Sequence, residues 1–242
     1  MSPIHRHSID YQVDGAAYQG VLLHDPGLAG QPAVLMAPDW MGVSDGAIAS
    51  AERIAGGGFA VFVADMYGAG SRPTNQDEAA AMAGPLKADA AEARRRIAGA
   101  LQTLLQQVDA RLLRRKPPAA VGFCFGGGHV LELCRAGATL SSVVSIHGDL
   151  SAATPTAPGS IKSPILVLHG SADPIAPESQ RRDFEAEMTA AGAPWSMLVF
   201  GGAVHSFTDP AAAHAGVAMY DADCARRTFQ MTEQFLDDGF AA

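Results

Sequence analysis

The chain has 242 residues, 48% of them hydrophobic, with a formal net charge of −8 and a pI near 5.4. The acidic balance argues against nucleic-acid binding, because a phosphate backbone must be met by clustered lysines and arginines. Length and apolar content suffice for one large core, and no shift in composition marks a linker, so we expect a single domain over residues 1–242.

Apolar and β-branched runs predict strands at about residues 8–13, 18–23, 33–37, 59–64, 119–123, 142–147, 164–169 and 196–200. Helices are predicted at about residues 45–57, 86–115, 125–136, 178–191 and 211–237. The first two strands flank Asp14-Gly15, which favours a hairpin. Later strands and helices largely alternate, which is typical of parallel strands joined by crossover helices. We therefore expect an α/β fold: a doubly wound, mostly parallel sheet of eight strands, with helices on both faces and no large lid domain.

The one basic run, Arg94-Arg95-Arg96, falls within the helix predicted at 86–115. Apolar residues recur at helical spacing along that segment, namely Ile97, Leu101, Leu104, Leu105, Val108 and Leu112. The basic side chains therefore form the solvated face of an amphipathic helix. Just before it, the segment from Met66 to Pro85 is expected to be a long loop that walls one side of an open, shallow pocket.

The sequence lacks the apolar segments that membrane insertion or secretion requires. No hydrophobic run reaches the roughly 18 residues of a membrane span, and the start Met-Ser-Pro-Ile-His-Arg has no apolar signal core. Cysteines at 124, 134 and 224 contain no CxxC pair, which fits a reducing compartment and neither a disulfide framework nor a zinc site. We expect a cytoplasmic protein in which Cys134 and Cys224 pack in the core.

The stretch Gly-Phe-Cys-Phe-Gly around Cys124 carries the strongest functional signal. It lies between a short apolar strand and a helix, which is the context of a nucleophile elbow. Gly122 and Gly126 suit a turn in which larger side chains would collide with neighbouring backbone. The helix that begins here points its N–H groups and positive dipole end at the sulfur, which favours thiolate over thiol. Cys124 is the first candidate for a covalent catalyst, the alternative being a small buried hydrophobe in a glycine-rich helix start.

Two later loops supply partners for such a nucleophile. Asp173 follows the strand predicted at 164–169, and His205 follows the strand predicted at 196–200. Nucleophile, acid and histidine thus occur in the chain order of the α/β-hydrolase fold, each just beyond a strand. An imidazole can take the thiol proton and later donate it to the leaving group, while a carboxylate fixes the tautomer. We predict a Cys124–His205–Asp173 triad rather than an Asp173 that merely caps the next helix.

The same motifs resemble a known family. Gly-Phe-Cys-Phe-Gly-Gly, His-Gly-Ser-Ala-Asp-Pro, His-Ser-Phe-Thr and the early Ala-Pro-Asp-Trp-Met-Gly look like the dienelactone hydrolase family of the α/β-hydrolase superfamily, over roughly residues 8–238. The resemblance implies a cysteine nucleophile, hydrolysis of a lactone or ester, and neither a metal nor an organic cofactor.

Two features depart from the family pattern. The family's ring-cleavage enzymes carry a glutamate after the third strand that contacts the resting cysteine, and the shorter Asp39 stands at that position. They also hold the lactone carboxylate with two arginines, where this chain has Gly68-Ala69-Gly70 and Asp209. Only Arg72 remains as a nearby guanidinium. Because an acidic residue repels an anionic ligand, we expect a preference for neutral esters or lactones.

Backbone groups are expected to complete the site. In this fold the N–H after the nucleophile, that of Phe125, and an N–H of the loop after the third strand, that of Trp40, form the oxyanion hole. The substrate pocket is expected to involve Asp39, Trp40, Arg72 and Phe207.

The remaining histidines have other expected roles. His147 and His169 end strands but stand outside the triad's chain order, so structural hydrogen bonding is expected for both. No metal-ligand spacing is evident among the others, which are His5, His7, His24, His129 and His214.

The sequence therefore predicts a cysteine-dependent carboxylic-ester hydrolase that forms a thioester intermediate on a small lactone or ester. We expect a monomer or weak dimer without nucleic-acid or membrane partners. Three alternatives stay open: a thioesterase, a ligand-binding protein that has lost turnover, and a redox sensor using Cys124. The departure at Asp39 is the only hint of the second. The third has no resolving cysteine nearby in the sequence, and it requires Cys134 to approach Cys124 in space.

Overall fold

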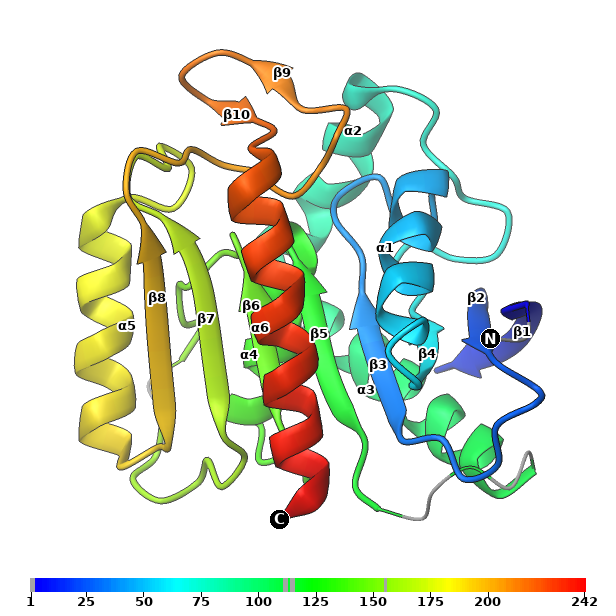
Figure 1. Ribbon diagram of the computed structural model, residues 1–242. Helices are drawn as coiled ribbons and strands as arrows, with labels where there is room; N and C mark the ends of the chain where they lie inside the picture. The colour runs from blue at the N-terminus through cyan, green and yellow to red at the C-terminus, as the bar shows by residue number, and fades with distance from the viewer. Residues whose placement is uncertain (1–2, 111–112, 114–115, 155) are drawn as a thin grey trace. The chain divides into compact units, whose positions relative to one another are not determined.

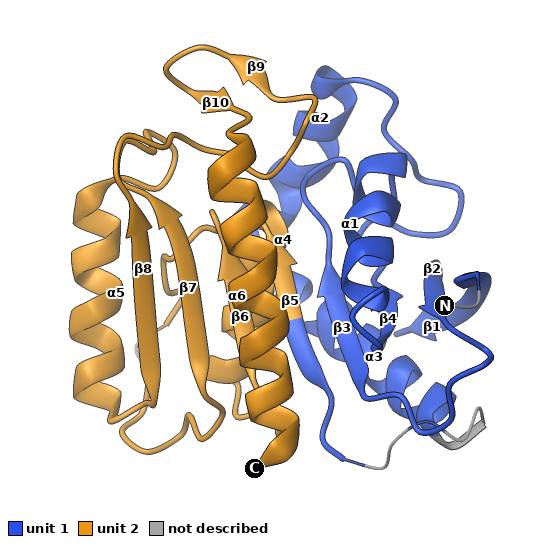
Figure 2. Cartoon of the chain, in the orientation of Figure 1, with its two compact units in different colours: residues 1–120 blue, residues 121–242 orange. Residues whose placement is uncertain are grey.

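The structure is a computed structural model that describes residues 3–110, 113, 116–154 and 156–242. The chain divides into two compact units, residues 1–120 and residues 121–242, which Figure 2 distinguishes by colour. Within the described residues, no helix combines the length and apolarity needed to cross a lipid bilayer. All eight predicted strands are present as β1–β8, with ends shifted by a few residues.

The first unit is built on four strands in the order β1-β2-β4-β3. These are β1 (His5–Val13), β2 (Ala16–His24), β3 (Ala33–Ala37) and β4 (Ala60–Val63). The pairs β1–β2 and β2–β4 are antiparallel, and β3–β4 is parallel. Helix α1 (Asp45–Ala55) packs on β4, and α3 (Ala90–Ala110) packs on β1 and β3. Figure 1 shows α1 in front of β3 and β4 and α3 behind them, so helices cover both faces here.

The predicted hairpin is confirmed. Val13 pairs with Ala16, which leaves Asp14 and Gly15 as a two-residue loop with φ angles of 49° and 82°. Positive φ at both positions is the requirement of a type I′ turn, whose twist matches that of the flanking strands.

In the second unit β6 (Val143–Ile146), β7 (Ile165–Gly170) and β8 (Trp195–Phe200) run parallel and side by side. Strand β5 (Ala119–Phe123), which contains the boundary between the units, precedes β6 in the order. Every residue of β6 and β7 is buried, which explains why these strands read as continuous apolar runs. The helices are α4 (Phe125–Arg135), α5 (Glu178–Ala191) and α6 (Ala222–Ala241).

Helices lie on both faces of β6. A Cβ added at Gly239 of α6 would lie 2.8 Å from the Ser142 side chain, and one at Gly127 of α4 would lie 2.7 Å from the Ser145 hydroxyl. Side chains three positions apart in extended chain point to opposite faces. Glycine at these two points therefore lets α4 and α6 pack closely on opposite sides of the strand.

The helix predicted at 86–115 is two helices, which is a correction. Helix α2 (Gln76–Ala88) occupies half of the expected loop, and α3 begins at Ala90. Between them Asp89 leaves helical geometry, with φ −123° and ψ 83°, and its Oδ1 accepts the N–H of Glu92 at 2.9 Å as a cap. The predicted end at Arg115 lies outside the described residues.

Most of the predicted apolar face of α3 is confirmed, since Ile97, Leu101, Leu104 and Val108 are buried. The prediction is wrong for Leu105, because 37% of this residue is exposed. Leu112 lies outside the described residues.

The helix predicted at 211–237 also starts later, at Ala222. Its expected first turns form a short hairpin of β9 (Ala213–His214) and β10 (Ala218–Met219). Gly216, with φ 75°, lies in the turn, and Asp221 caps the true helix by accepting the N–H groups of Asp223 and Cys224. Pairing of β10 with the backbone of His205 outweighs the helix propensity of this alanine-rich stretch.

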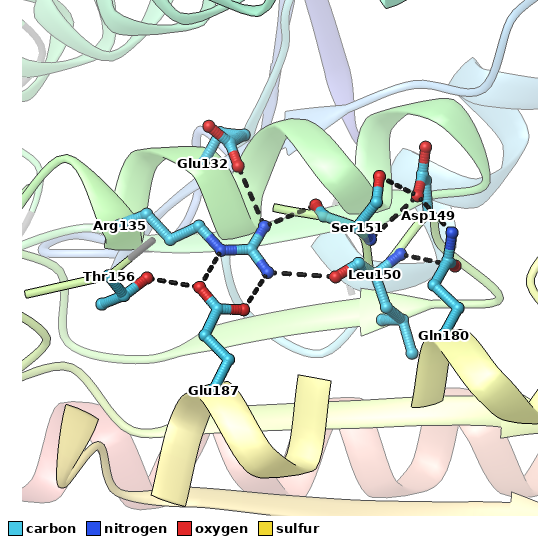
Figure 3. Close-up of polar contacts among 8 residues, drawn as sticks. All are labelled: Glu132, Arg135, Asp149, Leu150, Ser151, Thr156, Gln180 and Glu187. Atoms are coloured by element: carbon cyan, nitrogen blue, oxygen red, sulfur yellow. Dashed lines mark hydrogen bonds and ion pairs between the residues drawn. The ribbon is translucent and has the colours of Figure 1, made fainter. Parts of the chain in front are cut away.

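A buried ion-pair cluster fastens the far end of α4 (Figure 3). Arg135 donates two hydrogen bonds to Glu187 of α5, at 2.9 and 2.7 Å, and one to Glu132 at 2.9 Å. Its remaining donors bond the carbonyls of Leu150 and Ser151 at 3.0 and 2.9 Å. One guanidinium thus ties α4, which begins at the elbow, to α5 and to the loop after β6.

Candidate active site

The turn at Cys124 has the geometry of a nucleophile elbow. Cys124 has φ 51° and ψ −117°, lies directly between β5 and α4, and is half-buried. A Cβ at Gly122 would lie 2.2 Å from the carbonyl oxygen of Gly126, so no larger residue fits there. The N–H of Cys124 donates to the Ile146 carbonyl at 3.0 Å, which fixes the turn to β6.

The three predicted triad residues meet in the second unit. His205 Nε2 lies 3.0 Å from Cys124 Sγ, and His205 Nδ1 lies 2.7 Å from Asp173 Oδ2. Asp173 follows β7 and His205 follows β8, so parallel neighbours bring their loops to one edge of the sheet. This arrangement lets the imidazole exchange a proton with the sulfur while the carboxylate holds its other nitrogen.

Asp173 also serves the local turn. Its Oδ1 accepts the N–H groups of Ile175 and Ala176 at 2.8 and 3.0 Å, just before α5. Asp173 therefore has both of the roles considered from the sequence: one carboxylate oxygen orders the turn before α5, and the other faces His205. These bonds fix the carboxylate that orients the imidazole.

The loop of His205 is held by backbone pairing. The His205 N–H donates to the Val217 carbonyl at 3.0 Å, and the His205 carbonyl accepts the N–H of Met219 at 3.1 Å. Ahead of the loop, a Cβ at Gly170 would lie 2.3 Å from the Ala203 carbonyl oxygen, so glycine allows the close approach of the β7 and β8 loops. The β9–β10 hairpin, which the sequence did not predict, is therefore what anchors the histidine.

The electrostatics favour a charged imidazole. Burial alone would lower the pKa of His205, but the hydrogen bonds to Asp173 and Cys124 outweigh it and raise that pKa to about 10. Burial likewise works to raise the pKa of Asp173, and the bonds from His205 and Ala176 reverse this, so that pKa is lowered. At neutral pH the arrangement holds an imidazolium between a carboxylate and the sulfur.

Two further histidines lie near the triad, and each makes a hydrogen bond of the structural kind that was expected. His147 Nε2 is 2.7 Å from Thr208 Oγ1, and His169 Nε2 is 2.9 Å from the Ala176 carbonyl. Burial lowers the pKa of both imidazoles, so both are neutral beside His205. The partner Thr208 had no signal in the sequence, because only the folded loop brings it to His147.

The predicted site residues of the first unit form their own arrangement. Asp39 Oδ1 accepts the N–H of Met41 at 2.8 Å, and the Trp40 carbonyl accepts the Tyr67 hydroxyl at 2.7 Å. Tyr67 also lines a cavity of about 320 Å³ between the loop before α2 and the helices α2 and α3. Sequence reasoning missed Tyr67, which fixes the peptide that follows Trp40.

The Arg72 side chain contacts other residues of the first unit. Its guanidinium pairs with the buried Asp65 at 3.3 Å and donates to the carbonyls of Gln19 at 2.7 Å and Ser71 at 3.0 Å. A guanidinium with these partners braces the loop after β4, and it must break them to hold a ligand carboxylate.

Two aromatic residues near the elbow are buried. Phe125 is the first residue of α4, where helical N–H groups have no carbonyl partner within the helix, and its ring packs edge-on against His129 at 4.2 Å. Phe207 was expected to line the pocket, but its ring is fully buried and packs on His147 at 5.0 Å and Phe200 at 5.3 Å. Phe207 therefore packs against residues beside the triad and presents no surface to a substrate.

The geometry of α4 removes Cys134 as a resolving cysteine. Nine residues of α4 lie between Cys124 and Cys134, and the rise over these ten steps places their Cα atoms about 15 Å apart, against the roughly 7 Å limit of a disulfide. Burial raises the pKa of Cys134 to about 12. Cys134 packs in the core as predicted, whereas Cys224 is only half-buried, and burial raises its pKa to about 11.

Comparisons with known proteins identify the family of the chain. A model of the dienelactone hydrolase family matches residues 19–239. A solved structure from metagenomic libraries, a dienelactone hydrolase-like promiscuous phosphotriesterase, is 32% identical, covers 97% of this chain and 98% of its own, and has a TM-score of 0.89. An uncharacterised Caenorhabditis elegans protein is 35% identical over 131 residues, 50% of this chain and 80% of that protein.

The fold is shared more widely. An α/β hydrolase enzyme from a Medee basin deep-sea metagenome library is 18% identical, with a TM-score of 0.70 over 100% of both chains. The predicted α/β-hydrolase fold is therefore confirmed, with mostly parallel strands, six helices among the described residues and no large lid domain. From the family match and these relatives, the chain is a carboxylic-ester hydrolase that belongs to the dienelactone hydrolase family.

Proposed function

We propose that this protein hydrolyses small neutral esters or lactones through a Cys124–His205–Asp173 triad. The observation that carries the proposal is the position of the His205 ring, with Nε2 3.0 Å from the Cys124 sulfur and Nδ1 2.7 Å from the Asp173 carboxylate. These are the contacts a general base needs toward its nucleophile and its orienting acid.

The reaction has two steps. The Cys124 sulfur attacks the acyl carbon, the C–O bond to the alcohol breaks, and His205 donates its Nε2 proton to the departing oxygen, which leaves a thioester. His205, now neutral, takes a proton from water, whose oxygen attacks the thioester and releases the acid and the cysteine. The oxyanion of each tetrahedral intermediate needs two N–H donors, for which we retain Phe125, at the start of α4, and Trp40.

Two charged residues support the preference for neutral substrates. Asp209 follows His205 in the same loop and is half-buried, and Arg72 is already paired with Asp65. A carboxylate ligand would thus face a negative charge without gaining a guanidinium. The proposal therefore excludes the anionic dienelactone as the preferred substrate, while keeping the hydrolytic chemistry of the family.

We also propose that residues 1–242 form one catalytic domain. The boundary between the two compact units falls inside a single strand, β5, and the family match runs through it without a break. A strand shared in this way gives no linker at which two domains would separate.

Turnover of a chromogenic short-chain ester by purified wild type and Cys124→Ala tests the function. We expect the variant to lose at least about a hundredfold in kcat/KM while its circular dichroism spectrum stays unchanged. Cys134→Ala, a cysteine on the same helix but in the core, serves as the matched control and should retain wild-type turnover. Undiminished hydrolysis by Cys124→Ala would refute the mechanism.

Phosphotriester hydrolysis is a second candidate, favoured by the 32% identical relative described as a promiscuous phosphotriesterase. In this case the sulfur attacks phosphorus, the aryl oxygen leaves with the His205 proton, and water cleaves the resulting S–P bond. An uncharged aryl dialkyl phosphate should release its aryl alcohol in a Cys124-dependent way. Release that continues in Cys124→Ala would assign that activity to another site.

A further inference from the structure

A second imidazole lies against the ring of His205. The ring centroids of His147 and His205 are 5.3 Å apart and the ring planes meet at 64°, an edge-to-face contact. His147 directly follows β6, the strand between those that lead to Cys124 and Asp173, and only 2% of it is exposed. Its position thus places an immobile ring on one flank of the histidine of the triad.

Several contacts hold His147 in place. Its Nε2 lies 2.7 Å from Thr208 Oγ1, and its ring packs on Phe207 at 5.0 Å and Phe123 at 6.2 Å. Its backbone N–H donates to the Leu168 carbonyl at 2.8 Å. Thr208 comes three residues after His205, so the hydrogen bond also joins the end of β6 to the loop of His205.

The backbone of His147 is strained. Among the described residues, four that are not glycine have positive φ, and one of these, Asp14, belongs to the β1–β2 turn. The other three are Cys124, His147 at 37° and Ser206, which lie in the turns and the loop that follow β5, β6 and β8. Such conformations persist where the surroundings dictate them, and they gather at functional sites.

The His205 ring needs support beyond its two polar contacts to keep its orientation. Rotation about its Cβ–Cγ bond, within the tolerance of the hydrogen bond to Asp173, turns Nε2 away from the Cys124 sulfur, yet Nε2 must stay directed at that sulfur and later at the leaving oxygen. Productive proton transfer tolerates a misorientation of about 10–20°. The ring of His147 packs against the imidazole, where it opposes such a rotation.

We propose that His147, anchored by Thr208, is a positioning residue that keeps the His205 imidazole aligned between Asp173 and Cys124. The inference rests on the proposed function of the triad. The groups that face His147 are His205, Asp173 and His169, and burial followed by the charge on His205 lowers the pKa of His147. His147 therefore stands neutral beside an imidazolium, where a charged ring would repel it.

The test compares His147→Ala, His147→Phe and Thr208→Val with wild type. His147→Ala removes the ring, and we expect kcat for a chromogenic ester to fall by about 10- to 100-fold with KM changed less than about threefold. His147→Phe keeps a ring edge in place and should retain kcat to within about threefold. Thr208→Val keeps the ring but removes its anchor, the same hydrogen bond that His147→Phe loses, and we expect a similar loss of kcat of about two- to threefold. Phe200→Leu, two rings further from His205 than His147 in the same aromatic cluster, is the matched control and should alter stability without altering kcat.

A second readout needs no ester. The rate at which iodoacetamide alkylates Cys124 reports how well the imidazole beside it activates the sulfur. In His147→Ala this rate near neutral pH should fall severalfold. His147→Phe should keep the wild-type rate.

The inference would be overturned if His147→Ala kept both the wild-type kcat and the wild-type rate of Cys124 alkylation. Unchanged kcat in Thr208→Val would also overturn it. Equal losses in His147→Phe and His147→Ala would also overturn it, because the polar nitrogens and not the ring edge would then matter. These outcomes differ from failure of the proposed function, in which wild type itself shows no hydrolysis that depends on Cys124.

Discussion

The Nε2 of His205 lies 3.0 Å from the Sγ of Cys124, although 81 positions of sequence separate the two residues. Two local structures create the contact. The strained turn after β5 positions the Cys124 sulfur, and the loop after β8, which pairs with β10, positions the His205 imidazole. Both follow from short sequence motifs, whereas their meeting depends on parallel strands that end at one edge.

Asp173→Asn should reduce kcat by about a hundredfold or more. The amide removes the charge that stabilises the imidazolium, and it can stabilise the wrong tautomer of His205. The measurement is steady-state hydrolysis of a chromogenic ester. Asp183→Asn, an exposed carboxylate on α5, is the matched control. If Asp173→Asn kept full activity, another group would have to orient the imidazole.

The contribution of His205 to stability should disappear in alkaline solution. Its pKa is raised from 6.5 to about 10 in the folded protein, so the folded state binds the proton more tightly than the unfolded state. The resulting stabilisation is complete below about pH 6.5 and is lost as the pH rises through about 10. Urea unfolding of wild type and His205→Gln should show a difference in free energy of unfolding that shrinks over this range. A difference that grows with pH would contradict the imidazolium assignment.

Neutral lactones should be better substrates than anionic ones. Losing a charge-assisted hydrogen bond costs about 1.5–3 kcal/mol per missing arginine, so two losses lower kcat/KM by about a hundredfold or more. The comparison is kcat/KM for a dienelactone against an uncharged lactone of similar size. Asp209→Asn should improve only the anionic substrate, and Arg72→Gln should change both by the same factor. Faster turnover of the dienelactone, lost selectively in Arg72→Gln, would show that Arg72 leaves Asp65 to bind substrate.

Arg135→Met should destabilise the fold by about 3–5 kcal/mol, because the buried Glu132 and the half-buried Glu187 both lose this guanidinium. Arg182→Met, which breaks an exposed pair with Glu178 on α5, is the matched control and should cost less than about 1 kcal/mol. Urea denaturation measures both. Equal effects of the two variants would show that the cluster in Figure 3 adds no stability beyond a surface pair.

The features that sequence predicts best are those whose chemistry is local. Asp14-Gly15 favours a turn with positive φ at both residues. The glycines around Cys124 permit a close approach of strand and helix that larger residues would prevent. The order of Cys124, Asp173 and His205 along the chain then limits which side chains meet.

The features that escaped prediction depend on tertiary contacts or on signals that compete. Helix α2 had a local signal, since Asn75 caps it by accepting the Glu78 N–H at 3.0 Å, but Pro85, a residue type that disfavours helix interiors, competes with that signal. The sequence of the β9–β10 hairpin predicts a helix, whereas in the structure β10 pairs with His205. Neither the contact of His147 with Thr208 nor that of Arg135 with Glu187 follows from spacing, because the two partners lie on different elements.

The most direct test of the mechanism is to identify the acylated residue. Wild-type protein mixed with an activated ester and quenched in acid before deacylation should carry one acyl group, and peptide mass spectrometry should locate it on Cys124. Cys124→Ala should carry none, and His205→Gln should form the adduct far more slowly. An acyl group on a different residue, or steady ester hydrolysis without any adduct on Cys124, would contradict covalent catalysis by this cysteine.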